Sequence, residues 1–314
     1  MINKNNFIIK LFFIIIFFFS YMMFKKIHSK YLINTALCVV AKRENRYIKE
    51  FVEYYKNLGI THIFLYDNND IEDENFNNIL KDYINNNFVK IINYRGLFKP
   101  QKNAYKNCYN NLKNNYDWIA FFDVDEYLYI VNVTNINDFL SLSKFKKCSS
   151  ILINWKYYGD NNNLFYKPKP LKERFLIPTY LQKNKNVNKY FYSGGKTIAR
   201  GKLKIIWAHF PHFLKNKNIC RPDGNIIKNP FSPPQFSKAY INHYITKSTE
   251  EFAEKTNRGT VYSRYSSHRK YLFKKIINYF LYNKITKEKI NILGQKLNIN
   301  ESLIYKLVNK YYKL

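Results

Sequence analysis

The first part of the chain alternates between blocks of apolar residues and polar corners. Four continuous apolar runs are typical of strands covered on both faces, and they occupy residues 35–41, 61–66, 88–93 and 118–122. Three intervening segments repeat apolar residues at helical spacing, at residues 48–55, 76–83 and 101–112. This alternation predicts an α/β fold in which a sheet is covered by flanking helices.

The second half of the chain has a less regular pattern. Short apolar runs predict strands at residues 151–155, 196–200 and 204–207. Four prolines within residues 221–236 indicate a loop or lid. Ser248 and Glu251 match a capping box, which predicts a helix that extends to about Arg258. The chain beyond Ser267 has a helical pattern.

Residues 7–24 form an apolar segment with one charged residue, Lys10. With its flanks the segment reaches the length of about 20 residues that a bilayer-spanning helix needs. A cleaved signal peptide is the alternative, but Lys25 and the residues after it offer no small-residue cleavage site. We therefore expect an uncleaved, single-pass membrane anchor. Lysines on both sides leave its orientation open, and a eukaryotic protein would place the domain in the Golgi or ER lumen.

These patterns predict three parts of the chain. They are an anchor with short flanks at residues 1–30, an α/β domain at residues 31–265 and a helical extension at residues 266–314. No internal repeat is visible, and 314 residues suffice for one large domain or two small ones.

The four cysteines are far apart in the sequence. They lie at positions 38, 108, 148 and 220, and no metal-binding spacing relates them. Cys38 falls in an apolar run, where we expect a buried thiol. Disulfides are the alternative for a lumenal domain, and the sequence does not pair them.

The formal net charge of +30 is compatible with three kinds of partner: nucleic acid, an anionic membrane surface or an anionic substrate. The basic residues are spread through every segment, without an Arg-rich stripe or a recognisable reading helix. We therefore interpret most of the charge as solvated surface and expect no nucleic-acid partner.

Polar corners follow three of the predicted strands, at residues 42–45, 67–70 and 123–126. Ligands of open α/β sheets bind beyond the carboxyl ends of the strands, so these corners predict one nucleotide-sized site. Asp123, Asp125 and Glu126 follow a buried strand, where carboxylates need compensation. Mg²⁺ or Mn²⁺ suits such oxygen ligands and would in turn bind a diphosphate. This is the DxD pattern of nucleotide-sugar glycosyltransferases, although a solvated turn can also carry it.

Several ordered segments now give the chain a resemblance to a known family. They are residues 42–45 with 50–55, residues 59–62 with 66–68, Gln101 with Ala104, Tyr105 and Cys108, residues 123–128, Trp155 with Tyr158 and Gly159, and residues 241–244 with Lys247, Ser248, Glu251, Phe252, Lys255, Arg258 and Gly259. Over about residues 35–260 the chain resembles glycosyltransferase family 92 and related glycosyltransferase 2-like proteins. The resemblance implies a GT-A fold, a nucleotide-sugar donor with UDP as the expected nucleotide, and inversion at the anomeric carbon.

Two departures from the family pattern concern the acceptor side. Asp160 follows Gly159, where the family often has Ser, and the chain beyond about residue 265 has no counterpart. The identity of the acceptor, a glycan or another hydroxyl compound, is therefore open.

Site roles follow from this pattern and this resemblance. The expected metal ligands are Asp123, Asp125 and His243. The alternative for His243 is a structural histidine. Glu126 is expected either to hold a metal ligand in place or to orient the sugar acceptor. The expected donor-binding residues are Lys42, Arg43, Glu44, Asp67, Asp123 and Lys196, and Arg200 and Lys247 are further candidates for phosphate contact. An inverting transfer needs a general base, for which Asp160 and Glu173 are the candidates, Glu173 being preferred. His209 and His212 are expected in a structural loop.

The sequence thus predicts a membrane-anchored, metal-dependent glycosyltransferase, with transfer of a hexose as the expected reaction. One alternative is a basic module that binds nucleic acid, for which the charge distribution gives no support. The other is a membrane-tethered binding or scaffold protein without catalysis, whose DxD pattern binds no metal.

Overall fold

The computed structural model describes residues 33–98, 100–179, 194–203, 218–228, 233–259 and 269–312. Residues Asn34–Leu314 belong to one compact unit. The predicted anchor at residues 7–24, the predicted strand at residues 204–207, His209 and His212 lie outside the described residues. Within the described part of the chain, every helix is too short or too polar to cross a membrane.

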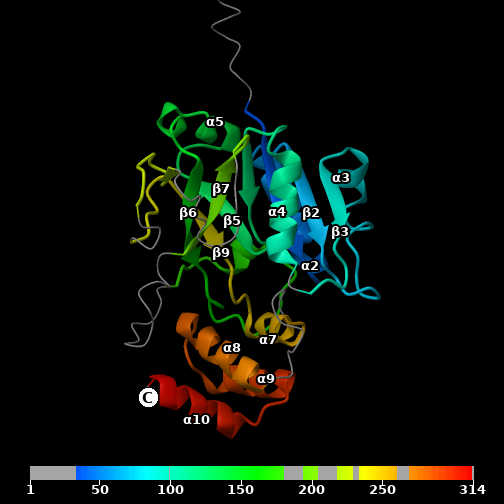
Figure 1. Ribbon diagram of the computed structural model, residues 1–314. Coiled ribbons are helices and arrows are strands. Elements are labelled where there is room, and N and C mark those ends of the chain that lie inside the picture. Colours follow the sequence, from blue (N-terminus) through cyan, green and yellow to red (C-terminus); the bar gives the residue numbers. More distant parts are fainter. Residues whose placement is uncertain are drawn as a thin grey trace, which may run out of the picture. The chain divides into compact units, whose positions relative to one another are not determined.

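A mixed β-sheet forms the centre of this unit (Figure 1). Its described strands are β1 (Thr35–Ala41), β2 (His62–Asp67), β3 (Val89–Asn93), β4 (Trp118–Phe121), β5 (Glu126–Ile130), β6 (Ser150–Tyr157), β7 (Gly195–Arg200), β8 (Ile219–Cys220) and β9 (Ala239–His243). They are ordered β3-β2-β1-β4-β7-β6-β9-β5, and β8 pairs with β6. The first four strands in this order are parallel, and β7 joins β4 antiparallel. The predicted mixed α/β sheet is therefore confirmed.

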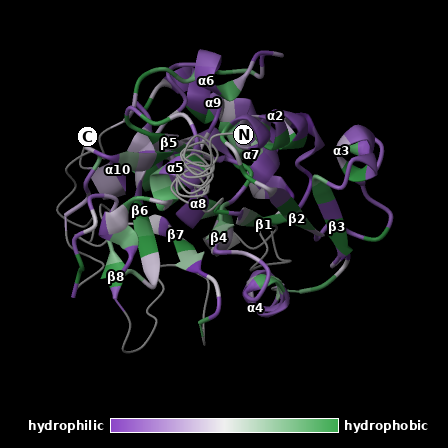
Figure 2. Ribbon diagram, turned by 90° about the horizontal axis from the view of Figure 1, so that it is seen from above, coloured by the Kyte–Doolittle hydropathy of each residue, from purple (hydrophilic) through white to green (hydrophobic). Residues whose placement is uncertain are grey.

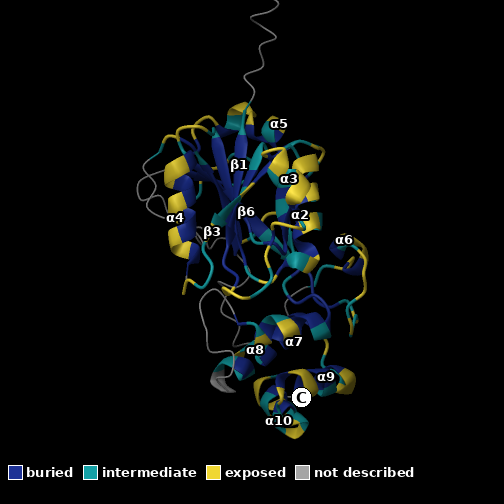
Figure 3. Cartoon of the chain, turned by 90° about the vertical axis from the view of Figure 1, so that its right-hand side faces the viewer, coloured by how far each residue is buried: buried dark blue, intermediate teal, exposed yellow. Residues whose placement is uncertain are grey.

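Helices cover both faces of the sheet and one of its ends. The described helices are α2 (Asn45–Asn57), α3 (Lys81–Asn85), α4 (Gln101–Leu112), α5 (Ile136–Leu140), α6 (Leu171–Arg174), α7 (Thr249–Asn257), α8 (Arg269–Tyr282), α9 (Lys287–Leu297) and α10 (Glu301–Tyr312), with a 3₁₀ turn η1 (Ser143–Phe145). Figure 3 shows α4 on one face and α2 and α3 on the other. Helices α7 to α10 gather beyond the carboxyl ends of the parallel strands (Figure 1).

Burial explains why the first strand and helix form as predicted. Every residue of β1 is buried, as expected of a strand covered on both faces. In α2 the buried residues recur at helical spacing: Tyr47, Ile48, Phe51, Val52 and Tyr55. Figure 2 shows the same division, with hydrophobic strands inside and hydrophilic outer faces on the helices.

The predicted helix at residues 76–83 is wrong in its extent. Phe76 and Leu80 are buried as expected, but the helix begins only at Lys81 and ends at Asn85. The guanidinium of Arg95 donates to four backbone carbonyls of the preceding loop, those of Asp70, Ile71, Asp73 and Glu74. These contacts hold the loop before Phe76, and residues 76–80 form turns in which the Leu80 N–H donates to the Phe76 carbonyl.

The expectation of a buried thiol at Cys38 is also wrong. Cys38 of β1 is bonded to Cys108 of α4, and Cys148 is bonded to Cys220 of β8. Packing of α4 on β1 brings the two Cα atoms of the first pair to 6.3 Å, within the range that a disulfide needs. All four cysteines of the sequence are thus paired.

The C-terminal segment is helical as predicted and packs on α7. The capping box is confirmed, because the Ser248 side chain accepts from the backbone N–H of Glu251 and the Glu251 side chain accepts in return. Phe252 and Ala253 of α7 share one core with buried side chains of the last three helices, among them Ile276, Leu293 and Ile304. Helix α7 therefore has the sheet edge on one side and α8 to α10 on the other.

Candidate functional site

The candidate site lies in the turn between β4 and β5. Buried Phe121 ends β4, Asp123 and Asp125 lie in the turn, and Glu126 begins β5. Strands β1 and β2 run parallel to β4, so the corners that follow them open at the same edge of the sheet. The predicted coincidence of the three polar corners is thus present in the fold.

Asp123 is held from two elements. Its Oδ1 accepts hydrogen bonds from Gln101 Nε2 and Tyr105 OH of α4, both at 3.1 Å. Its Oδ2 lies 2.8 Å from Nζ of Lys196, which is buried in β7 and also lies 3.5 Å from Glu126 Oε2. Burial alone would lower the pKa of Lys196, but Asp123 and Glu126 outweigh it and raise this pKa well above its usual value. Lys196 is therefore charged and fixes the orientation of Asp123.

Asp125 is buried and faces two other groups. Its Oδ2 lies 2.5 Å from Nζ of Lys255 on α7, and its Oδ1 lies 3.8 Å from Nε2 of His243 at the end of β9. Burial would raise the pKa of Asp125, but the charges of Lys255 and Lys247 outweigh it, and this pKa lies well below its usual value. Asp125 is therefore ionised at neutral pH.

His243 and Glu126 lie next to this carboxylate, and the pKa values of both are shifted from their usual values. Burial lowers the pKa of His243 to about 4, so its imidazole is neutral at pH 7. Glu126 is fully buried, and burial together with the charges of Asp123 and Asp125 raises its pKa well above the usual value despite Lys196. Within the described part of the chain, Glu126 Oε1 and His243 Nδ1 have no hydrogen-bond partner.

A divalent cation fits the chemistry of this donor set. As the side chains stand, no group of three His, Cys, Asp or Glu residues in the described ranges is arranged to hold a metal ion. Asp125 Oδ1 and Glu126 Oε1 nevertheless lie 3.8 and 4.0 Å from the same imidazole nitrogen of His243. Carboxyl oxygens with a neutral imidazole suit Mn²⁺, and Glu126 Oε1 is a buried polar atom without a hydrogen-bond partner in the described ranges. Lys255 at present supplies the positive charge beside Asp125.

The predicted donor-binding residues at the other two corners are joined by ion pairs. Lys42 pairs with Asp70, and Arg43 pairs with Asp73. Asp67 accepts from Arg95 at 2.8 Å and from the backbone N–H of Asn69 at 2.9 Å, so both of its oxygens are engaged. These contacts fix the loops after β1 and β2.

Glu44 belongs to a buried cluster that links the first corner to α7. Its Oε1 accepts from Arg258, and its Oε2 lies 3.5 Å from Lys247 Nζ. Burial would raise the pKa of Glu44, but Arg258 and Lys247 outweigh it and the pKa lies below its usual value. Lys255 of α7 and Arg258, the C-cap residue of this helix, thus pair with two different corners, Lys255 at Asp125 and Arg258 at Glu44. Sequence reasoning gave neither a role, although both lie in a segment that carried the family resemblance.

The two candidate bases differ in their surroundings. Asp160 Oδ2 lies 2.7 Å from Nζ of Lys289 and accepts from Tyr279 OH, and these side chains are almost fully buried. A carboxylate enclosed in this way joins the sheet domain to α8 and α9 and does not present itself to an acceptor. Glu173 is exposed on α6, and its neighbour Arg174 forms a buried ion pair with Glu251 of α7.

Aromatic rings flank the imidazole of His243. The ring centroids of Trp155 and Tyr157, both in β6, lie 5.2 and 5.6 Å from that of His243. Gly194 packs against Trp155 so closely that an added Cβ would come within 2.5 Å of the indole. The imidazole is thereby held in place by its neighbours.

Comparisons with known proteins point to one family. The family model for glycosyltransferase family 92 matches residues 36–279. A family 92 protein of Ricinus communis is 26% identical over 102 residues, and one of Oryza sativa subsp. japonica is 22% identical over 116 residues. These alignments cover 32% and 37% of this chain but only 18% and 19% of the relatives.

Solved structures show a weaker likeness. S. aureus TarS in complex with UDP gives a TM-score of 0.39 at 15% identity, over 85% of this chain and 71% of that one. GalNAc-T7 with UDP, GalNAc and Mn²⁺ gives a TM-score of 0.29 at 12% identity, over 54% of this chain and 35% of that one.

An α/β sheet with acidic residues at the carboxyl edge of its parallel strands defines a class of proteins that bind ligands at this edge. Within that class, the match of the family model over most of the sequence identifies the family. The chain belongs to glycosyltransferase family 92, as its sequence resemblance indicated.

Proposed function

We propose that this chain transfers a sugar from a nucleotide-sugar donor, most simply a UDP-linked hexose, to a hydroxyl group of a glycan or another acceptor. The observation that carries the proposal is the convergence of Asp125, Glu126 and neutral His243 at the carboxyl edge of the mixed sheet. Membership of family 92 supports glycosyl transfer as the reaction.

Mn²⁺ or Mg²⁺ is the proposed cofactor, and Asp125 and His243 would hold it, with Asp123 and Glu126 beside them. When bound, such a cation stabilises the negative charge of a departing diphosphate. The protein supplies the orientation: Lys196, Gln101 and Tyr105 fix Asp123, while the aromatic neighbours fix His243. These contacts reduce the reorganisation that binding requires.

The nucleoside end of the donor is proposed to lie at the corners after β1 and β2. Lys42, Arg43 and Asp67 hold these loops through their ion pairs, and Glu44 anchors the first loop to α7. For an inverting transfer we retain Glu173 as the proposed base. It is the exposed member of the two candidates, and Arg174 ties its helix to α7, which carries Lys255.

The two disulfides support a proposal about the compartment. Disulfides form in oxidising surroundings, such as the ER lumen or the cell exterior, and are rare in the cytosol. With both pairs bonded, we propose that the domain folds in such a compartment and that residues 7–24 anchor it to the membrane. Labelling of thiols in denatured, unreduced protein tests the first point, since a reactive thiol in the majority of molecules would contradict it.

A donor screen tests the proposed reaction. The full-length chain is incubated with a panel of nucleotide sugars and Mn²⁺, and release of the nucleoside diphosphate is measured with and without candidate acceptors. We expect release from at least one donor, and we expect EDTA to abolish it. Failure to release a nucleoside diphosphate from every donor, together with absence of Mn²⁺ binding, would support the scaffold alternative instead.

A further inference from the structure

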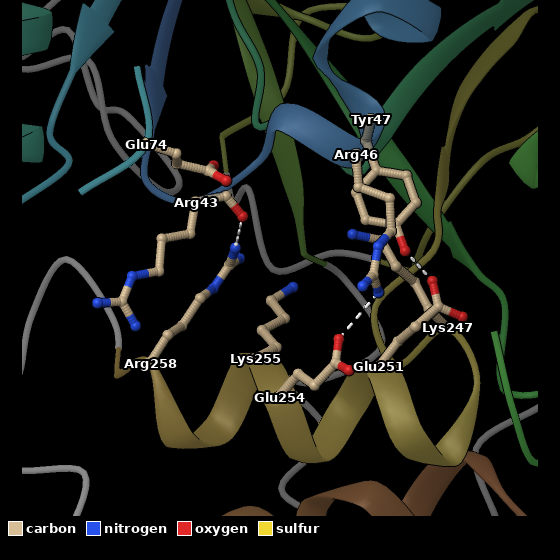
Figure 4. Close-up of a pocket in the computed structure, with 9 residues that line it drawn as sticks. All are labelled: Arg43, Arg46, Tyr47, Glu74, Lys247, Glu251, Glu254, Lys255 and Arg258. Atoms are coloured by element: carbon tan, nitrogen blue, oxygen red, sulfur yellow. Dashed lines mark hydrogen bonds and ion pairs between the residues drawn. The ribbon is translucent and has the colours of Figure 1, made fainter. Parts of the chain in front are cut away.

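A cavity of about 230 Å³ lies between the corner after β1 and helix α7 (Figure 4). Five basic residues line it: Arg43, Arg46, Lys247, Lys255 and Arg258. They come from the β1–α2 corner, from α2, from the turn before α7 and from α7 itself. In Figure 4 their side chains reach into the space between α7 and the start of α2.

The acidic residues of the cavity are engaged by other groups. Glu254 pairs with Arg46 at 2.8 Å, and Glu251 pairs with Arg174 at 2.6 Å. Glu74 accepts from the backbone N–H of Asn45 at 3.0 Å. Five cations face three carboxylates in the lining, and each of the five also pairs with a carboxylate, four of them with one outside the lining. An anionic ligand would therefore bind by sharing or replacing these ion pairs.

Two of the basic residues are held in an unusual backbone conformation. Arg43 has φ of 51° and Lys247 has φ of 57°. Positive φ is uncommon outside Gly and Asn, and it is concentrated at ligand-binding and switch positions. Most of the other positive-φ residues in the described ranges that are not glycine are asparagines. Two basic residues from separate loops therefore adopt this conformation beside the same cavity.

Lys255 joins the cavity to the acidic site. It is three residues before Arg258, so the two side chains leave the same face of α7. Its Nζ contacts Asp125, and its side chain retains 31% of its accessible surface. The four-carbon side chain of lysine is flexible, and Lys255 is partly exposed. Its ammonium group can therefore exchange one oxygen partner for another without movement of the helix.

We propose that this cavity binds the phosphate groups of the donor, and that Lys255 exchanges Asp125 for a phosphate oxygen when they bind. The proposal rests on the proposed function and names the residues of α7 that would act in it. Arginine binds phosphate through two parallel N–H donors, and lysine binds it as a point charge. When the diphosphate binds, the exchange releases the Asp125 carboxylate from Lys255 and leaves it available to a cation.

The exchange has a thermodynamic consequence. Lys255 competes with a divalent cation for Asp125, whereas a phosphate group that attracts Lys255 removes this competition. Donor phosphate and cation should therefore raise each other's affinity by the same factor, as linkage requires. Removal of the Lys255 charge should strengthen cation binding in the absence of nucleotide.

Calorimetric titration of the full-length chain tests the cavity. The probes are UDP, GDP, uridine and inorganic pyrophosphate, and the variants are Arg46→Ala and Lys255→Met. Arg46 is a half-exposed residue, so its removal tests the cavity without disturbing the buried Glu44 cluster. Each variant should bind pyrophosphate about tenfold more weakly than the wild type, because one charge-assisted contact is lost. The same loss is expected for whichever nucleoside diphosphate binds. The affinity for uridine should stay unchanged.

Lys296→Ala is the matched control, because Lys296 is an exposed lysine of α9 that pairs with Glu250 away from the cavity. It should bind every probe as the wild type does. Wild-type affinity for pyrophosphate in both cavity variants would overturn the proposal and leave the proposed function intact. The wild type could instead bind pyrophosphate but neither UDP nor GDP, and the variants could lose pyrophosphate binding. That result would support a phosphate site in the cavity and contradict the proposed donors.

Electron paramagnetic resonance of Mn²⁺ in the absence of nucleotide tests the exchange by itself. Lys255→Met should bind Mn²⁺ more tightly than the wild type, by about tenfold, because the competing ammonium is gone. Lys296→Ala should match the wild type. Equal or weaker Mn²⁺ binding by Lys255→Met would show that Lys255 does not compete for Asp125.

Discussion

Lys255 Nζ lies 2.5 Å from Asp125 Oδ2, so a cation from α7 is paired with a carboxylate at the proposed metal site. The two residues are 130 positions apart in the sequence. Lys196 has the corresponding place beside Asp123, at 2.8 Å. The two lysines differ in exposure, since the side chain of Lys196 retains 3% of its surface and that of Lys255 retains 31%.

This difference predicts that the two aspartates have different effects on stability. Asp123→Ala removes one partner of buried Lys196, and we expect a loss of about 3 kcal/mol in the free energy of unfolding. Lys255 can turn toward solvent, so Asp125→Asn should cost about 1 kcal/mol or less. Urea denaturation of both variants checks the order, and a larger loss in Asp125→Asn would contradict it.

The buried pair of Asp160 and Lys289 predicts a structural role that can be separated from catalysis. Lys289→Met leaves the Asp160 carboxylate buried and unpaired, which should destabilise the protein by about 3–5 kcal/mol. The double variant Asp160→Asn with Lys289→Met should recover most of that stability and retain transferase activity. Melting temperature and nucleotide release are the measurements. A stable but inactive double variant would show instead that Asp160 acts in the reaction.

The disulfide between Cys38 and Cys108 predicts a large stabilising effect. It closes a segment of 70 residues between β1 and α4, for which chain entropy gives about 4 kcal/mol. Replacement of both cysteines by alanine should lower the free energy of unfolding by an amount of this order. Dithiothreitol should lower the melting temperature of the wild type. A melting temperature that is the same with and without reductant would contradict the bonded pairs.

Burial of neutral His243 predicts a pH-dependent difference in stability. The imidazole has a pKa of about 4 in the folded state against about 6.5 in an unfolded chain, so the unfolded state binds the extra proton between these values. The stability of the wild type relative to His243→Gln should therefore fall as pH drops from 6.5 to 4, by about 3 kcal/mol. Denaturation of metal-free protein at several pH values measures it. A constant difference would show that His243 is not buried as a neutral group.

The fold could be predicted where burial leaves a periodic pattern in the sequence. Strand β1 is buried on both faces and α2 on one, and each pattern was visible. The extent of α3 could not be predicted, because Phe76 and Leu80 are buried at helical spacing although residues 76–80 form turns. The pairing of Cys38 likewise depends on how α4 packs on β1.

The site could be predicted only in part, for the same reason. The position of Asp123 and Asp125 follows from a polar corner after an apolar run, which local sequence shows. Their lysine partners come from β7 and α7, so only the folded chain brings them together. Asp160 was a candidate base by sequence, and its partner Lys289 lies in the C-terminal helices, where local sequence does not reveal the contact.

The most direct test of the central claim compares the wild type with Asp125→Asn in donor turnover. Release of nucleoside diphosphate is measured with Mn²⁺ and the best donor from the screen, and circular dichroism verifies that both proteins are folded. We predict that the variant loses at least about 100-fold in rate. Asparagine removes the negative charge of a proposed ligand of the cation, and this cation stabilises the leaving diphosphate. Equal rates for two folded proteins would contradict the account.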